Sequence, residues 1–380
     1  AKGLRQYWGY MPIALLAPHA GYAAANTPEG VIAEVQQMVH NLHAGGLEVI
    51  LDVVLNHTGE GEQDGPWIGL RGFDDLGYYR HRANSTYEDV TGTGNTLDLG
   101  YPPGLRLALD ALRHWVTDYG VDGFRFDLAA TLLRAEGQAG ESAFLAAVAQ
   151  DPILSGVKLI AEPWDLGMGG YRLGTFPSPW REWNDRFRDT VRDAFRSRPG
   201  VLPELATRAT GSSDIFGQRL RPTASINFVT AHDGPTLADL VSYQRKHNEA
   251  NGEANHDGGH DQRAWNGGVE GPSDDPAIVD ERARRVRSVL ALTLLSRGVP
   301  MLSGGDELGR TQLGNTNAYC QDNAISWYDW ANVDDALIGF TRHVIALKRA
   351  QLSLAPDAWL TGEPGDDGRR DAEWFGVDGS

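Results

Sequence analysis

The stretch Gly120-Val-Asp-Gly-Phe-Arg-Phe-Asp127 decides the fold, because it is a short apolar run that follows a glycine and ends on a carboxylate. Residues 47–57, 157–162 and 225–233 repeat this pattern and end on His57, Glu162 and Asp233. Helical patterns separate these runs, and strands that alternate with helices predict a parallel sheet. Polar residues at the carboxyl ends of such strands are typical of the active site of a (β/α)8 barrel.

The helix and strand signals are regular along the chain. Thr27 and Pro28 are typical of the N-cap and first position of a helix, which we expect to end at Gly45 and Gly46. Further helices are expected at 104–119, 141–150, 185–196 and 279–297. Six strands are expected, at 47–55, 120–127, 157–162, 180–184, 225–233 and 298–302. Two long connections, 56–103 and 232–278, leave the carboxyl ends of strands and are predicted to be active-site loops.

Bulk properties narrow the class of protein. A chain of 380 residues with 41% hydrophobic residues is long enough for one large barrel domain. The net charge of −17 argues against nucleic acid and anionic membrane partners and favours a neutral substrate. No apolar run approaches the roughly 18 residues of a membrane span. Cys320 is the single cysteine, which excludes an intrachain disulfide, so we expect a cytoplasmic protein.

Two carboxylates have surroundings that suit complementary chemical roles. Side chains alternate along a strand, so Arg125 and Asp127 share one face, and Phe124 and Phe126 the other. A neighbouring guanidinium keeps an aspartate ionised and nucleophilic, whereas apolar neighbours favour a protonated Glu162. A nucleophilic carboxylate and a carboxylic acid are the pair that retaining glycoside hydrolysis needs.

Other polar residues allow more than one interpretation. His57 and His232 are either structural histidines or donors to sugar hydroxyls, and Asp52 is expected to brace Arg125 or a neighbouring hydroxyl. No metal ion and no cofactor are expected. The Gly-rich stretch that contains the metal-like residues His247, Asp257, His256, His260 and Asp261 matches no standard ligand spacing. The glycines at 304–305 and 167–170 lack the spacing of a nucleotide site.

Four motifs resemble the signature regions of the α-amylase superfamily, glycoside hydrolase family 13. They are Asp52-Val-Val-Leu-Asn-His57, Gly123-Phe-Arg-Phe-Asp127, Ile160-Ala-Glu162 and Val229-Thr-Ala-His-Asp233. Longer stretches resemble its glycogen debranching enzyme and isoamylase branch. These include Tyr7-Trp-Gly-Tyr10, Leu70-Arg-Gly-Phe-Asp74, Ala161-Glu-Pro-Trp-Asp165, His247-Asn-Glu-Ala-Asn-Gly252 and Asn317-Ala-Tyr-Cys-Gln-Asp322. The likeness extends over nearly all of residues 7–350.

The resemblance implies a role for each residue of these motifs. It implies that Asp127 is the nucleophile, Glu162 the general acid/base and Asp233 the stabiliser of the transition state. The substrate-binding residues that it implies are Tyr10, whose ring stacks under the sugar, and Asp52, His57, Arg125, Trp164 and His232.

The resemblance also implies a domain organisation. We expect residues 1–350 to form a (β/α)8 TIM barrel that lacks its first two βα units, and 351–380 to begin a C-terminal β-domain. A chain truncated in this way exposes unpaired sheet edges, which predicts poor stability.

The predicted function is retaining hydrolysis of α-1,6 branch linkages, with a branched α-glucan such as glycogen or its limit dextrin as the partner. Two alternatives use the same fold. One is α-1,4 hydrolysis or glucan transfer at the same site, and the other is an inactive amylase-fold fragment that only binds glucan.

Overall fold

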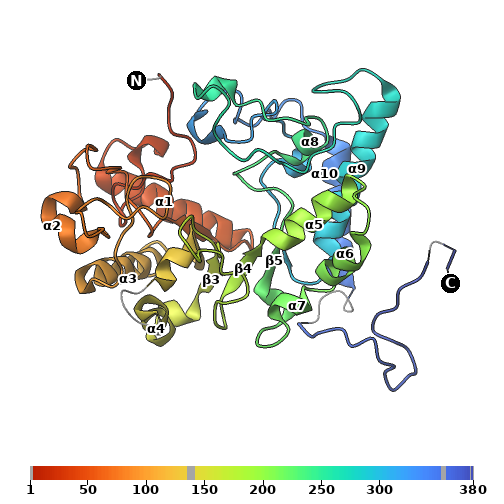
Figure 1. Cartoon of the computed structure of the whole chain (residues 1–380), viewed down its shortest axis with the longest axis horizontal. Coiled ribbons are helices and arrows are strands. Elements are labelled where there is room, and N and C mark those ends of the chain that lie inside the picture. The colour runs from red at the N-terminus through yellow and green to blue at the C-terminus, as the bar shows by residue number, and fades with distance from the viewer. Residues whose placement is uncertain (1–2, 135–141, 352–356, 377, 380) are drawn as a thin grey trace. The chain divides into compact units, whose positions relative to one another are not determined.

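The computed structural model describes residues 3–134, 142–351, 357–376 and 378–379 (Figure 1). The chain forms two compact units. Gly9–Trp183 makes up one, called here the N-terminal unit, and Ala1–Trp8 with Asn184–Ser380 makes up the other, the C-terminal unit. Among the described residues, no helix is long and apolar enough to cross a membrane.

A parallel sheet organises the N-terminal unit. Strand β1 (Ile50–Val53) pairs with β2 (Gly123–Phe126), β2 with β3 (Lys158–Ala161), and β3 with β4 (Arg181–Asn184). The register sets Asp52 opposite Arg125 and Phe126 opposite Ala161. The residues that directly follow β2 and β3, Asp127 and Glu162, therefore leave neighbouring strands at the same end of the sheet.

The helices of this unit cover an apolar core. They are α1 (Pro28–Ala44), α2 (Leu70–Tyr78), α3 (Pro102–Thr117) and α4 (Ala143–Gln150). The Phe126 ring lies 5.8 Å from that of Phe144 and 4.9 Å from that of Trp180, between centroids, and the side chains of Phe124 and Phe126 are fully buried. Phe124 and Phe126 point toward the helices, so Arg125 lies on the opposite face of the sheet, as the alternation of side chains along a strand predicts.

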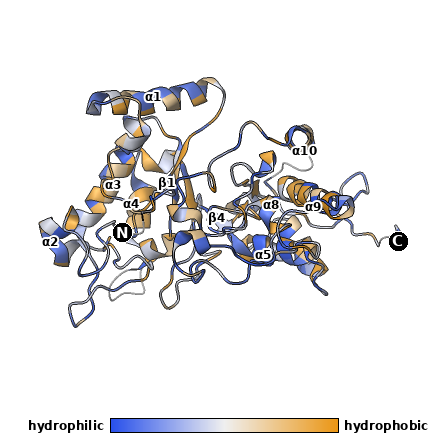
Figure 2. Cartoon of the chain, turned by 90° about the horizontal axis from the view of Figure 1, so that it is seen from above, coloured by the Kyte–Doolittle hydropathy of each residue, from blue (hydrophilic) through white to orange (hydrophobic). Residues whose placement is uncertain are grey.

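The C-terminal unit packs helices beside a shorter parallel pair. Strands β5 (Ser225–Asn227) and β6 (Val299–Pro300) pair in parallel. The helices are α5 (Asp185–Phe195), α6 (Leu202–Ala209), α7 (Ser213–Phe216), α8 (Leu237–Leu240), α9 (Pro276–Leu295) and α10 (Asp335–Ala350). Helices α9 and α10 lie side by side (Figure 1). Figure 2 shows apolar and polar residues alternating along α9, as expected for a helix with one buried face.

Short 3-10 turns connect the longer elements. They lie at Ala20–Tyr22, Ala129–Leu133, Leu154–Gly156, Pro222–Ala224, Glu249–Asn251, Asp306–Leu308 and Ala318–Cys320.

The predicted alternation of six strands with helices is confirmed, including the start of α1, where the Thr27 hydroxyl accepts a hydrogen bond from Gly30 N. The predicted strand ends at residues 55 and 233 are wrong. Strand β1 ends at Val53, because beyond it Asn56 O accepts from Leu97 N rather than from a neighbouring strand. Strand β5 ends at Asn227, and Val229 O accepts from the guanidinium of Arg192.

Candidate active site

A buried arginine collects three carboxylates at the end of the N-terminal sheet. The side chain of Arg125 is 5% exposed. Its Nη1 lies 2.8 Å from Asp52 Oδ1 and 3.2 Å from Asp127 Oδ1, and its Nη2 lies 3.0 Å from Glu162 Oε2. The four residues come from three consecutive strands or directly follow them, so the strand register itself brings them together.

This arrangement fixes the charge of the arginine. Burial acts against a charged Arg125, but the surrounding carboxylates, Glu162 first and then Asp52, raise its pKa well above the ordinary value. The guanidinium is therefore a permanent cation. Three carboxylates around one guanidinium leave an excess of negative charge when all are ionised.

Two aromatic rings flank the guanidinium. Its Cζ lies 4.2 Å from the Trp183 ring centroid and 5.8 Å from that of Tyr10. The Tyr10 hydroxyl donates to Asp52 Oδ2 at 2.6 Å, and burial, together with Asp52, raises the pKa of this phenol. Trp183 was missed from the sequence, although it lies on the predicted strand 180–184. These rings hold the Arg125 side chain in place between its carboxylate partners.

A chain of hydrogen bonds orients Asp127 from its other side. Asn56 Nδ2 donates to Asp127 Oδ2 at 2.8 Å and to its carbonyl oxygen at 2.9 Å. Asn56 Oδ1 in turn bonds His57 Nδ1, and His57 Nε2 bonds Tyr10 O at 2.7 Å. Burial lowers the pKa of His57. Both ring nitrogens face oxygen acceptors, and a neutral imidazole has one N–H, so it donates to only one of them at a time. His57 thus acts here as a buried link, and Asn56, its neighbour in the first motif, is a site residue that sequence reasoning missed.

The turn after Asp127 binds Glu162. The Glu162 side chain is 5% exposed, and its Oε2 accepts from Leu128 N at 2.6 Å. Ala129 N donates to Glu162 O at 2.8 Å. Leu128 has a φ of +41°, a left-handed conformation that is costly for a residue with a side chain. The strained turn therefore links the two carboxylates. Trp164, two residues after Glu162, is half-buried, and its backbone N–H donates to Glu162 O.

The remaining predicted residues, Asp233 and His232, belong to the C-terminal unit. Asp233 is exposed, and its charge acts on Arg188 and Arg192. The His232 ring packs edge-on against Trp8, with 4.7 Å between centroids. Of the three predicted catalytic carboxylates, Asp127 and Glu162 are thus the two that one unit brings together.

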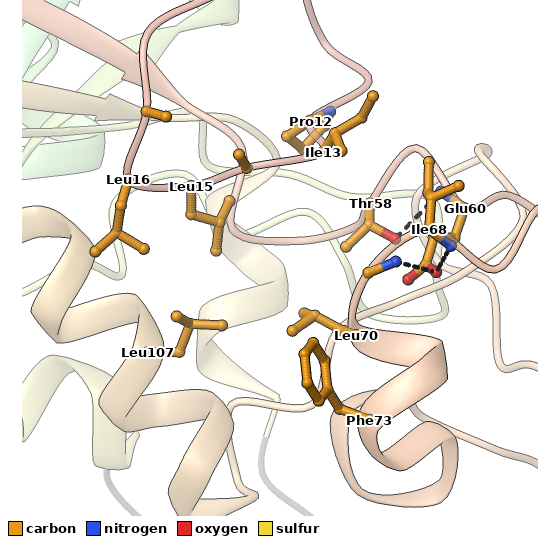
Figure 3. Close-up of a pocket in the computed structure, with 13 residues that line it drawn as sticks. Pro12, Ile13, Leu15, Leu16, Thr58, Glu60, Ile68, Leu70, Phe73 and Leu107 are labelled. Atoms are coloured by element: carbon orange, nitrogen blue, oxygen red, sulfur yellow. Dashed lines mark hydrogen bonds between the residues drawn. The ribbon is translucent and has the colours of Figure 1, made fainter. Parts of the chain in front are cut away.

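An apolar pocket of about 280 Å³ lies elsewhere in the N-terminal unit (Figure 3). Leu15, Leu70 and Phe73 line it, and Glu60 is its acidic residue. The Glu60 carboxylate accepts from Ile68 N and Gly69 N, each at 2.9 Å, and from two further donors. This carboxylate holds the 56–103 loop together. Among the described residues that line the pocket, Glu60 is the single carboxylate, whereas three carboxylates surround Arg125.

The metal-like stretch of the second long loop is held by two side-chain amides and a lysine. Asp257 Oδ2 accepts from Asn251 Nδ2 at 2.7 Å and from Asn317 Nδ2 at 2.9 Å, and Asp257 O accepts from Lys246 Nζ at 2.8 Å. Within the described ranges, no three His, Cys, Asp or Glu side chains are grouped as metal ligands.

Comparison with known proteins gives close relatives. No protein-family model matches the chain. It is 51% identical to a glycogen operon protein GlgX homolog of Mycobacterium tuberculosis, over 98% of this chain and 53% of that protein. It is 46% identical to a glycogen debranching enzyme of Serratia proteamaculans, over 99% of this chain and 56% of the relative. The chain therefore spans about half the length of the curated relatives that it matches.

Solved structures of pullulanases also match nearly the whole of this chain. A pullulanase from Bacillus acidopullulyticus matches 94% of this chain and 41% of its own, with a TM-score of 0.74 and 25% identity. A pullulanase from Paenibacillus barengoltzii, solved with maltotetraose, matches 93% of this chain and 52% of its own, with a TM-score of 0.73 and 25% identity. Over nearly all of its own length, the chain is a homologue of the glycogen debranching enzymes.

Proposed function

We propose that this chain carries the catalytic carboxylates of a retaining glycoside hydrolase that cleaves α-1,6 branch linkages of glycogen or a limit dextrin. One observation carries the proposal: Asp127 and Glu162 follow neighbouring parallel strands and pair with the same buried guanidinium. Similarity to debranching enzymes and to pullulanases supports the substrate class. The six strands and the pullulanase match support a (β/α)8-type barrel. Because glycogen is stored inside cells, a cytoplasmic location goes with this proposal.

Asp127 is the nucleophile in this proposal. Arg125 Nη1 and Asn56 Nδ2 contact different oxygens of its carboxylate, and these two contacts fix the direction of the carboxylate. A carboxylate oxygen attacks the anomeric carbon while the bond from that carbon to the glycosidic oxygen breaks. The product of this step is a covalent glucosyl ester of Asp127.

Glu162 is the acid and then the base. It gives its proton to the departing glycosidic oxygen, and it later takes a proton from the water that hydrolyses the ester. Its Oε2 lies 3.0 Å from Arg125 Nη2 and accepts from Leu128 N at 2.6 Å, so these two contacts fix the direction of the carboxyl group.

The other residues bind the sugar. The negative charge that surrounds Arg125 stabilises the positive charge of an oxocarbenium-like transition state. Asp233, as an exposed carboxylate, accepts from hydroxyls of the flattened ring, and His232 donates to them. Tyr10 and Trp164 offer aromatic faces to the substrate.

The test measures new reducing ends released from glycogen limit dextrin, with a linear maltooligosaccharide in parallel. Release from the branched substrate is expected, and Asp127→Asn should reduce it by at least about 10³-fold with an unchanged circular dichroism spectrum. Asp280→Asn, at an exposed position of α9, is the matched control and should retain activity. Full activity in Asp127→Asn, or release from the linear substrate alone, would overturn the proposal.

A further inference from the structure

We propose that Trp330, backed by Tyr328, is a stacking platform for glucose rings of a glucan chain, in addition to the carboxylate site. The choice of ligand rests on the proposed function. Trp330 is 72% exposed, although a large aromatic side chain is usually mostly buried. The segment lies in the C-terminal unit, just before α10, and outside the stretches that resemble glycoside hydrolase signature regions.

The ring of Trp330 stacks on Tyr328, which in turn contacts Arg310. Its centroid lies 5.5 Å from that of Tyr328, with 14° between the planes, and Arg310 Cζ lies 5.1 Å from the Tyr328 centroid. Tyr328 is 36% exposed, and its hydroxyl lies so close to Gly304 that a Cβ there would come within 2.6 Å of it. Tyr328 is therefore fixed against the body of the unit. Because Trp330 stacks on Tyr328, the orientation of its ring is fixed as well, and the ring remains exposed to solvent.

The turn that carries these rings is held by its own polar groups. Asp329 Oδ1 accepts from Ala331 N at 3.2 Å, and Asp329 Oδ2 accepts from Asn332 Nδ2 at 2.8 Å. Downstream, Asp334 N donates to Leu308 O at 3.1 Å. Trp327 Nε1 donates to Asp322 Oδ1 at 3.0 Å. Tyr328 and Trp330 are thus presented from a turn whose own hydrogen bonds hold it in place, which lowers the entropic cost of binding.

The chemistry around the rings selects a neutral polyhydroxyl ligand. Three exposed aspartates, Asp322, Asp329 and Asp334, border the segment, and the whole chain has a net charge of −17. Such a surface repels anionic ligands, whereas carboxylates accept hydrogen bonds from hydroxyl groups. A glucopyranose ring has an apolar C–H face that suits an indole and a rim of hydroxyls that suits the aspartates. An α-glucan chain repeats that ring, so it matches both parts of this surface.

The experiment measures retention of the 380-residue chain in native gels that contain glycogen, in an Asp127→Asn background so that no substrate is consumed. Trp330→Ala should weaken the apparent affinity for glycogen about 5- to 10-fold, and Trp330→Phe, which keeps a ring, should lose less. Trp374→Ala removes a tryptophan of the C-terminal unit that is 68% exposed and lies outside the two predicted active-site loops, and it is the matched control. It should leave retention unchanged.

A kinetic arm separates this inference from the proposed function. With Asp127 intact, Trp330→Ala should release reducing ends from a short branched oligosaccharide at the unchanged rate. Retention of glycogen without any hydrolysis would preserve the platform and refute the proposed function. Hydrolysis together with unchanged glycogen retention in Trp330→Ala would overturn the platform. A change of molecular mass in Trp330→Ala by light scattering, with unchanged retention, would also overturn it, because the ring would then contact a second copy.

Discussion

Asn56 is bonded to Asp127 twice, through one amide nitrogen that donates to both the carboxylate and the carbonyl oxygen of the aspartate. The same amide group bonds His57 through its oxygen, so the direction of Asp127 depends on a chain of buried groups that reaches the backbone of Tyr10. In the proposed mechanism, Asn56 is therefore a positioning residue that acts on the reaction through Asp127.

Replacement of Asn56 tests this relationship. Asn56→Ala removes both bonds to Asp127, and kcat/KM on branched dextrin should fall about 10²-fold, because misplaced catalytic groups cost that much. The loss should lie in kcat rather than in KM if Asn56 does not touch the sugar. Asn84→Ala, at an exposed position of the same loop, is the control. A loss confined to KM would show that Asn56 binds substrate instead.

Arg125→Lys tests the shared guanidinium. A lysine keeps the positive charge but lacks the planar fork that contacts Asp52, Asp127 and Glu162 at the same time. We expect a fall in kcat/KM of about 10²- to 10³-fold. Urea unfolding should show a smaller loss of stability for Arg125→Lys than for Arg125→Gln, which leaves the carboxylates unpaired and should cost about 3–5 kcal/mol. Equal stability of all three proteins would contradict the arrangement.

The pH dependence of stability should report on Glu182, which is fully buried in β4. Burial raises its pKa from 4.5 to about 8, although Gly174 N and Phe176 N donate to the carboxylate. Below pH 4.5 the folded and unfolded chains are both protonated there. Between pH 4.5 and about 8 the unfolded chain gives up the proton first. Stability therefore falls across this window, by up to about 1.4 kcal/mol per pH unit.

Glu182→Gln imitates the protonated side chain and should flatten this dependence. The free energy of unfolding, measured with urea at pH 5 and pH 8, should differ less in the variant than in the parent chain. Glu204→Gln, at an exposed position of α6, should keep the parent's difference. An identical pH dependence in Glu182→Gln would show that this carboxyl does not titrate between those values.

Thr27→Ala tests the start of α1. The Thr27 side chain accepts from Gly30 N at 3.2 Å, so its removal leaves a helix N–H without its cap. We expect a loss of about 1 kcal/mol in the free energy of unfolding. Thr27→Ser keeps the hydroxyl and should retain most of the stability. A destabilisation as large in Thr27→Ser as in Thr27→Ala would assign the effect to packing of the methyl group.

The sequence predicts those features of the fold and site that depend on local pattern. Thr27 and Pro28 mark a helix start by their own chemistry, and alternation along β2 places Arg125 opposite Phe124 and Phe126. Asp127 and Glu162 directly follow buried apolar strands, which is why their place at one end of the sheet was predictable. Helix α10 was not predicted, although Leu337 and Val344 lie two turns apart on its buried side.

Features that depend on distant partners were not predictable from one sequence. The bond between Asn56 and Asp127 joins residues that are 71 positions apart, and the packing of Trp183 on Arg125 depends on the pairing of three strands. Strand β5 ends early because the guanidinium of Arg192 takes the carbonyl of Val229, and no periodicity of the strand itself contains that information.

The most direct test of the central claim, that Asp127 is the nucleophile of a retaining hydrolase, is to trap the covalent intermediate. The active protein would be incubated with a 5-fluoro α-maltosyl fluoride and digested, and the labelled peptide identified by mass spectrometry. We predict a glycosyl ester on Asp127, with no label in Asp127→Asn and with the α-anomer as the first product of normal turnover. A label on another carboxylate, or a β-anomer as the first product, would contradict the account.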